Sequence, residues 1–203
     1  MTDFFALLNE PRRPGLDANR LRHKFLALAA DVHPDRVHNA SEVEKAAANR
    51  HYAQLNAACQ CLTDPKTRLL HLLELERGSR PAEIQTIPPA LADWFVGIAA
   101  ICREADGFLL EREKVTSPLL KIQWFARAQD WIEQLQDWQK KLGGLRGELD
   151  ARLKLLDATW HNGSPLADAK AASLARLEEL YRFYGYFNRW QNQLQERISR
   201  LSF

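Results

Sequence analysis

Cysteine is scarce in this chain, and the three that occur are Cys59, Cys61 and Cys102. An odd number argues against a disulfide framework and fits a protein of a reducing compartment. Cys59 and Cys61 are two residues apart, so on a helix their side chains point about 200° apart and cannot bind one metal ion together. Because the chain also lacks a Cys-x-x-Cys pair, we expect no metal site.

Motifs that carry catalysis are missing too. The sequence has no glycine-rich phosphate loop, no serine or cysteine nucleophile in a known motif, and no histidine pair at metalloprotease spacing. We therefore expect no enzymatic activity and no cofactor.

Long apolar runs and an excess of one charge are also absent. Charged residues interrupt every apolar stretch before it reaches the ~20 residues of a membrane span. The amino terminus has no basic region followed by an apolar core, which argues against export. The 28 basic and 26 acidic residues leave a net charge of +2 without a basic block, so neither nucleic acid nor a membrane is indicated as a partner. These features predict a cytoplasmic protein.

Helical periodicity is what the sequence has in abundance. Asp17 is placed to cap a helix that runs to about Asp31, and Ser41 with Glu44 has the form of a capping box for a second helix. Apolar residues recur four and three apart in both helices: Leu21, Phe25, Leu28 and Val32 in the first, and Ala48, Tyr52, Leu55, Cys59 and Leu62 in the second. The pattern predicts two amphipathic helices that pack against each other.

The tripeptide His33-Pro34-Asp35 stands in the loop between these two helices. Pro34 fixes its own φ and disfavours helical backbone at His33, so the first helix must end there. Asp35 then presents a carboxylate that suits a charge-assisted contact with an arginine of a partner.

Further short patterns flank the two helices. They are Asp3-Phe4-Phe5-Ala6-Leu7-Leu8, Leu16-Asp17, Leu55-Asn56-x-Ala58, Leu62-x-Asp64-Pro65-x-x-Arg68 and Leu72-Leu73. With His33-Pro34-Asp35, residues 1–78 resemble the J-domain of the HscB/Jac-type co-chaperones of iron–sulfur cluster assembly. The resemblance implies a helix hairpin that stimulates the ATPase of a DnaK-type (heat shock 70 kDa) chaperone.

The resemblance also implies which residues meet the chaperone. They are the loop residues and a basic outward face on the first long helix: His33, Pro34, Asp35, Arg36, Arg20, Arg22, His23 and Lys24. At 100° per residue, Arg20, His23 and Lys24 lie opposite the apolar side, with Arg22 at its flank. The sequence departs from the family pattern at Ala27, Ala30 and Asp31, where relatives often carry further basic residues.

The rest of the chain predicts a second helical domain. Gly78-Ser79-Arg80-Pro81 and Ile87-Pro88-Pro89 mark the two ends of residues 79–89, which are predicted to be a linker. Residues 90–203 hold three amphipathic helices joined by short turns, an antiparallel three-helix bundle like that of the HscB-type proteins. The second of these helices has an apolar series four and three residues apart: Trp124, Ala128, Trp131, Leu135, Trp138, Leu142, Leu145 and Leu149. The predicted fold is therefore all-α, with a J-domain at 1–78 and a bundle at 90–203.

By the same resemblance, the bundle holds a client, the iron–sulfur cluster scaffold protein. The implied client-binding residues are Trp94 and Ile98 on the first bundle helix and Phe183 and Tyr186 on the last. The first helix lacks the acidic spacing of the family, and aromatics off the apolar side either form a binding patch or pack on a second face. An adaptor for another client, or an oligomerisation module, therefore stays open. A structural helical protein with a vestigial J-domain is least favoured, because His33-Pro34-Asp35 is intact.

Overall fold

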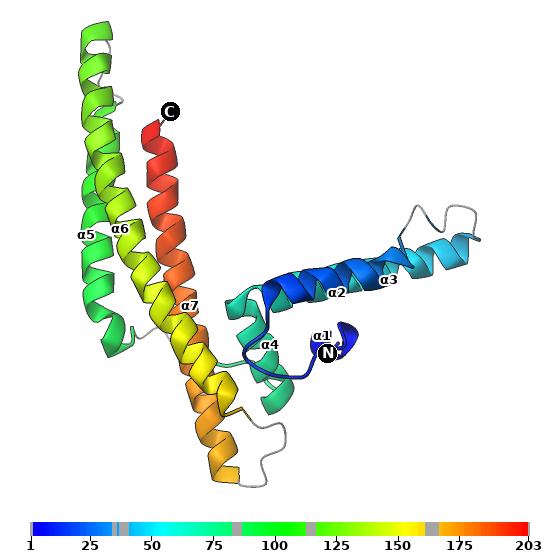
Figure 1. The fold of residues 1–203 in the computed structure, drawn as a ribbon. Helices are drawn as coiled ribbons and strands as arrows, with labels where there is room; N and C mark the ends of the chain where they lie inside the picture. The colour runs from blue at the N-terminus through cyan, green and yellow to red at the C-terminus, as the bar shows by residue number, and fades with distance from the viewer. Residues whose placement is uncertain are drawn as a thin grey trace. The chain divides into compact units, whose positions relative to one another are not determined.

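The computed structural model describes residues 2–33, 36, 41–82, 87–112, 117–160 and 167–202. These residues form helices and connecting turns and contain no strand, so the predicted all-α fold is confirmed (Figure 1). None of the described helices combines the length and the apolar character that a membrane crossing requires.

Capping side chains begin the first helices, two of them at the residues that the sequence predicts. In α1 (Phe4–Leu7) the Asp3 carboxylate accepts from the amides of Phe5 and Ala6. Asp17 accepts from the Arg20 amide at the start of α2 (Ala18–Ala30). Ser41 and Glu44 form the predicted capping box of α3 (Glu42–Thr63), which satisfies two backbone donors reciprocally.

Asp64-Pro65 makes the corner between α3 and α4 (Pro65–Arg77). Asp64 ends α3 and, with extended backbone, accepts from the Thr67 amide as the cap of α4. Pro65 sits at the first helical position, where its missing N–H leaves no bond unmade. Gly78 ends α4 in the left-handed region at φ 72°, which a side chain at this position would disfavour.

The described residues form two compact units. The amino-terminal unit comprises residues 1–82 and 151–182, and the bundle unit comprises residues 83–150 and 183–203. The grouping differs from the predicted domain limits because two long helices, α6 (Pro118–Ala158) and α7 (Ala167–Ser202), each contribute to both units. The limits at residues 78 and 90 stay predictions.

The core of the amino-terminal unit is built mainly from leucines on α1 to α4. Its fully buried side chains include Phe5, Leu8, Leu21, Leu55, Leu62, Leu69, Leu72 and Leu73. The residues predicted to face inward from α3 are buried, except Tyr52, which is half-buried. Figure 1 shows α2 and α3 side by side as a hairpin.

The bundle unit contains α5 (Ala92–Glu111), which follows the short 3-10 turn η2 (Pro89–Leu91), and parts of α6 and α7. The predicted apolar series of α6 is confirmed as its inner side, with Trp131 and Trp138 half-buried and the others buried: Trp124, Ala128, Leu135, Leu142, Leu145 and Leu149. Between helices, Phe108 stacks on Trp124 with ring centroids 5.2 Å apart, and Tyr184 donates to Asp150 over 2.7 Å.

Candidate functional site

His33 lies just beyond the carboxyl end of α2, where the sequence places it, while Pro34 and Asp35 lie outside the described residues. Its imidazole is half-buried and meets the ring of Tyr52 on α3 edge-on, with centroids 5.6 Å apart. The His33 carbonyl accepts from the Arg36 amide over 2.9 Å. His33 is therefore held at the loop end of the α2–α3 hairpin by an aromatic contact and a backbone bond.

Tyr52 is a supporting residue that the sequence gave no role beyond packing. Its ring also contacts Phe25 of α2, with centroids 6.0 Å apart. Tyr52 thus contacts both Phe25 of α2 and His33, a position that follows from its place on the inner side of α3. Aromatic pairs of this kind contribute about 0.5–1.5 kcal/mol each beyond the area they bury.

The basic side of α2 divides into two kinds of residue. Arg22 and His23 are exposed, as predicted. Arg20 and Lys24 instead form ion pairs with Glu10, at 3.0 Å from the Arg20 guanidinium and 2.6 Å from the Lys24 ammonium. Both cations therefore have a partner within the chain.

Arg36 is exposed and pairs with Asp31 over 3.2 Å. Because both side chains are solvated, this pair contributes little to stability, within ~1 kcal/mol. Arg36 can therefore leave Asp31 at small cost and meet another carboxylate.

Glu10 is the functional candidate that the sequence did not reveal. Its side chain is only 2% exposed, although it is a carboxylate. Besides its ion pairs, it lies next to Asn9, whose carbonyl accepts from the Lys24 ammonium over 2.8 Å. Its sequence signal is weak, because a glutamate before Pro11 reads as an ordinary loop residue.

Arg68, the last residue of the Asp64-Pro65-x-x-Arg68 pattern, is a structural residue. Its guanidinium is buried, donates to the Pro14 carbonyl over 2.7 Å, and also donates to the Leu62 carbonyl at the end of α3. It therefore fixes the proline-rich turn before α2 against the α3–α4 corner, which positions the start of α2.

His71 serves the same unit as a buried acceptor. Its Nε2 accepts from the Phe4 amide over 3.1 Å, and its ring stacks on Phe5 with centroids 5.8 Å apart. Burial lowers the pKa of the imidazole, because the charged form would lose its hydration. The neutral form therefore suits this site and leaves the nitrogen free to accept.

The predicted client-binding residues do not form one exposed surface. Phe183 and Ile98 are 3% and 1% exposed, so the expectation that Phe183 lies on an outer binding face is wrong. Trp94 and Tyr186 are half-buried: Trp94 packs edge-on against Trp138 and Tyr186 contacts Trp190. For Phe183 and Trp190, which is also buried, the structure shows the alternative of packing on a second face.

Exposed apolar side chains gather elsewhere in the bundle unit. Half of the ten large exposed apolar residues in the described chain lie at the end of α5 and the start of α6, namely Leu110, Leu119, Leu120, Ile122 and Phe125. Arg112 lies over the Trp124 ring and Arg127 over the Phe108 ring beside them. The sequence gave these residues no role.

Among the described residues, no three His, Cys, Asp or Glu side chains come together as a ligand group. Burial raises the pKa of the Cys61 and Cys102 thiols, which favours their neutral, unreactive form.

The chain is similar in sequence to known proteins over part of its length. No protein-family model matches the chain. The co-chaperone protein HscB homolog of Chromobacterium violaceum is 38% identical over 88 residues, which are 43% of this chain and 50% of that protein. The HscB homolog of Vibrio cholerae is 38% identical over 85 residues, again 50% of its length. The iron-sulfur cluster co-chaperone protein HscB of Mus musculus is 36% identical over 74 residues, 32% of its length. The chain thus spans half or less of these curated relatives.

Likeness in structure extends further along the chain. The chaperone HscB from Vibrio cholerae matches with a TM-score of 0.59 at 20% identity, over 96% of both chains. The human co-chaperone protein HscB matches with a TM-score of 0.53 at 18% identity, over 94% of this chain and 81% of that one. The chain is therefore similar in sequence to HscB co-chaperones over about two fifths of its length, and it has the fold of the solved HscB structures along nearly all of it.

Proposed function

We propose that this protein is a cytoplasmic co-chaperone that stimulates the ATPase of a DnaK-type chaperone and delivers a client to it, the iron–sulfur cluster scaffold protein. The observation that carries the proposal is the position of His33 just beyond the end of α2, at the loop end of the α2–α3 hairpin. The likeness to HscB co-chaperones supports it. In this function the protein activates a partner enzyme and catalyses no reaction itself.

The proposed chaperone contact is formed by His33, Pro34 and Asp35 together with the cations of α2 and the loop. Arg22 and His23 are exposed and can meet carboxylates directly, and Arg36 follows the tripeptide. Tyr52 is a positioning residue, because its ring supports the imidazole from behind. Arg20 and Lys24 can take part only while sharing their charge with Glu10.

The client is proposed to bind the bundle unit. Trp94 and Tyr186 are half-buried, and we propose that their accessible parts contact the client. Phe183 and Ile98 are buried and support this surface by packing in the core. The apolar cluster at the ends of α5 and α6 favours the second candidate function, an adaptor whose bundle binds another client or a second copy.

The chaperone proposal is tested by His33→Gln. We expect the variant to lose stimulation and leave the chaperone at its basal ATPase rate. The fold should persist, because the lost contact with Tyr52 is worth about 0.5–1.5 kcal/mol. ATPase assays with a DnaK-type chaperone encoded in the same genome, together with circular dichroism, measure both effects. His51→Gln is the matched control, since this histidine is exposed on α3 next to Tyr52. Full stimulation by folded His33→Gln would refute the J-domain function.

The client proposal is tested by comparing two aromatic truncations on α7. Phe183→Ala removes a buried ring and should lower the free energy of unfolding by about 3–5 kcal/mol. Tyr186→Ala removes a half-buried ring, so it should cost less stability and weaken binding of the scaffold protein, by roughly thirtyfold if it is a hot spot of about 2 kcal/mol. Thermal melting and scaffold binding are measured on both variants. Unchanged scaffold binding by Tyr186→Ala would favour the adaptor function.

A further inference from the structure

Glu10 occupies a defined position in the turn that ends α1. The Glu10 amide donates to the Phe5 carbonyl over 2.8 Å, and the Asn9 amide donates to the Ala6 carbonyl over 3.1 Å. Asn9 itself has a positive φ of 52°. These two bonds and the left-handed residue define a Schellman motif, in which Glu10 is the second residue after the cap Leu8.

An apolar side chain commonly fills this position. In Schellman motifs the residue in the place of Glu10 often makes a hydrophobic contact with the residue in the place of Phe5, which is fully buried here. The local fold therefore has no need of a carboxylate at residue 10. Burying one is costly unless cations and hydrogen bonds compensate for its lost hydration.

Arg20 and Lys24 supply that compensation. The Arg20 guanidinium donates to both Glu10 oxygens, from Nε to Oε1 over 3.2 Å and from Nη2 to Oε2 over 3.0 Å. The Lys24 ammonium lies 2.6 Å from Oε1. One carboxylate thus holds two of the four α2 residues predicted to meet the chaperone. The carboxylate also reduces the net charge of the group from +2 to +1.

We propose that Glu10 is a specificity-determining residue that withdraws Arg20 and Lys24 from the chaperone-binding surface. The inference rests on the proposed function and refines its site. Chaperone binding then depends mainly on Arg22, His23 and Arg36, and the chain fits a chaperone whose docking surface carries few carboxylates. A chaperone with a long acidic surface is disfavoured, because two of the cations that would meet it are already paired.

The two cations can survive the loss of Glu10. The side chain of Arg20 is 62% exposed and that of Lys24 is 32% exposed, so water can solvate both charges when the carboxylate is removed. A leucine at residue 10 would restore the usual apolar contact of the motif with Phe5. Glu10→Leu therefore tests the charge of Glu10 while the turn keeps its form.

The experiment measures the affinity of the wild-type chain and of Glu10→Leu for a DnaK-type chaperone of the same genome, at ~50 mM and ~200 mM salt. We expect Glu10→Leu to bind about three- to thirtyfold more tightly at the lower salt, since two exposed cations are released. The gain should shrink at the higher salt. Adding Arg20→Ala and Lys24→Ala to Glu10→Leu should abolish the gain.

Two results would overturn the inference and leave the proposed function intact. The first is a folded Glu10→Leu variant whose affinity and salt dependence equal those of a wild-type chain that does bind. The second is a steep fall in melting temperature for both Glu10→Leu and Glu10→Gln, which would make Glu10 a structural clamp. Absence of any wild-type binding would instead refute the proposed function, and the inference with it.

Discussion

Arg68 and His71 are polar side chains that the amino-terminal unit buries beside its leucines. Each has a backbone partner far away in the sequence. Arg68 donates to the Pro14 carbonyl, and His71 accepts from the Phe4 amide. Because a buried polar group without a partner costs about 1–3 kcal/mol, each also fixes the segment that satisfies it. At the scale of single residues, the hairpin that carries His33 is positioned by such bonds.

His71 should make the stability of the protein depend on pH. Burial lowers its pKa in the folded state below the ordinary value near 6.5, so the unfolded chain binds a proton more readily. The stabilisation is complete above the unfolded pKa and is lost as pH falls from about 7 through 6.5 towards the folded value. His71→Gln keeps an acceptor for the Phe4 amide but does not titrate. Urea unfolding of both proteins between pH 7.5 and 5, as a series of about five values, should show a steeper decline for wild type. Parallel declines would contradict the assignment.

Short-range features of single residues were predictable, and long-range ones were not. The predicted caps Asp17 and Ser41 follow from bonds within three residues. The pairing of Glu10 with Arg20 and Lys24 depends instead on how the turn after α1 packs against α2, which no local pattern encodes. The same holds for the support of His33 by Tyr52 across the hairpin.

At the scale of elements, α5 contains two glycines in opposite surroundings. A Cβ built at Gly97 would overlap the ring of Trp138 on α6, whereas one built at Gly107 would meet open space. Gly97 therefore permits close approach of two helices, and Gly107 only adds backbone freedom to the unfolded chain. The aromatic contact of Trp94 with the same Trp138 shows how tightly this part of the bundle is filled.

Alanine at these two glycines should have effects of opposite sign. Gly97→Ala should lower the free energy of unfolding by about 1–3 kcal/mol, because the added methyl forces Trp138 or the helix to move. Gly107→Ala should raise it by about 0.4–1 kcal/mol, because alanine favours the helix and has fewer unfolded conformations. Urea midpoints of the two variants give the comparison. Equal midpoints would show that α5 and Trp138 are less closely packed than described.

The helices themselves were largely predictable, while their surfaces were only partly so. Apolar spacing identified the inner side of α6 from Trp124 to Leu149, because a regular four-three series has one orientation that buries it. For the aromatics of α7 away from its apolar side, the sequence left open either a binding patch or packing on a second face. Phe183 is buried because α7 is enclosed on more than one side, a consequence of tertiary packing.

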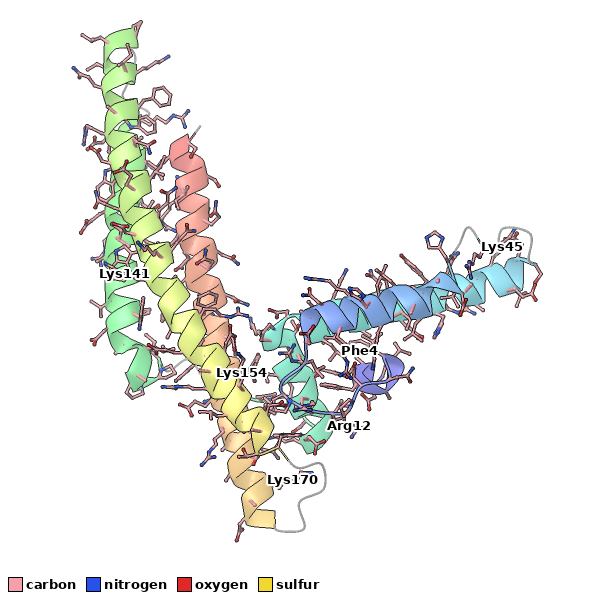
Figure 2. All side chains as sticks on the ribbon, viewed as in Figure 1. Phe4, Arg12, Lys45, Lys141, Lys154 and Lys170 are labelled. Carbon is pink, nitrogen blue, oxygen red and sulfur yellow. The ribbon has the colours of Figure 1, made fainter. Side chains whose placement is uncertain are left out.

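At the scale of the whole molecule, the amino-terminal unit is assembled from two distant parts of the sequence. Residues 1–82 combine with residues 151–182, the end of α6 and the start of α7. The parts are joined by ion pairs of α4 with α7, Glu76 with Lys170 over 2.8 Å and Arg77 with Glu178. Figure 2 labels Lys170 and also Arg12, whose guanidinium lies 2.8 Å from Asp3.

This composite unit could not be inferred from the sequence. Apolar periodicity assigns one continuous helix to one domain, so the sequence predicts that α6 and α7 belong entirely to the bundle. The contacts that tie their ends to residues 1–82 span more than ninety residues along the chain, as with Arg77 and Glu178. The unit that carries the proposed chaperone site and the unit that carries the proposed client site thus both include parts of α6 and α7.

Asp157 of α6 joins the two sequence segments of the amino-terminal unit, and its substitution tests whether they fold together. Its carboxylate accepts from Arg13, with Nε 2.9 Å away, and from the Gly15 amide over 2.8 Å, and the nearby Trp160 indole donates to the Arg12 carbonyl. Asp157→Ala leaves Arg13 and the Gly15 amide without this acceptor, so the free energy of unfolding should fall by about 1–3 kcal/mol. Amide hydrogen exchange should accelerate in residues 11–16, while Asp130→Ala, at an exposed position of the same helix, should change neither property. If Asp157→Ala behaves like Asp130→Ala, residues 1–82 fold without help from α6, and the hairpin carrying His33 is an independent domain.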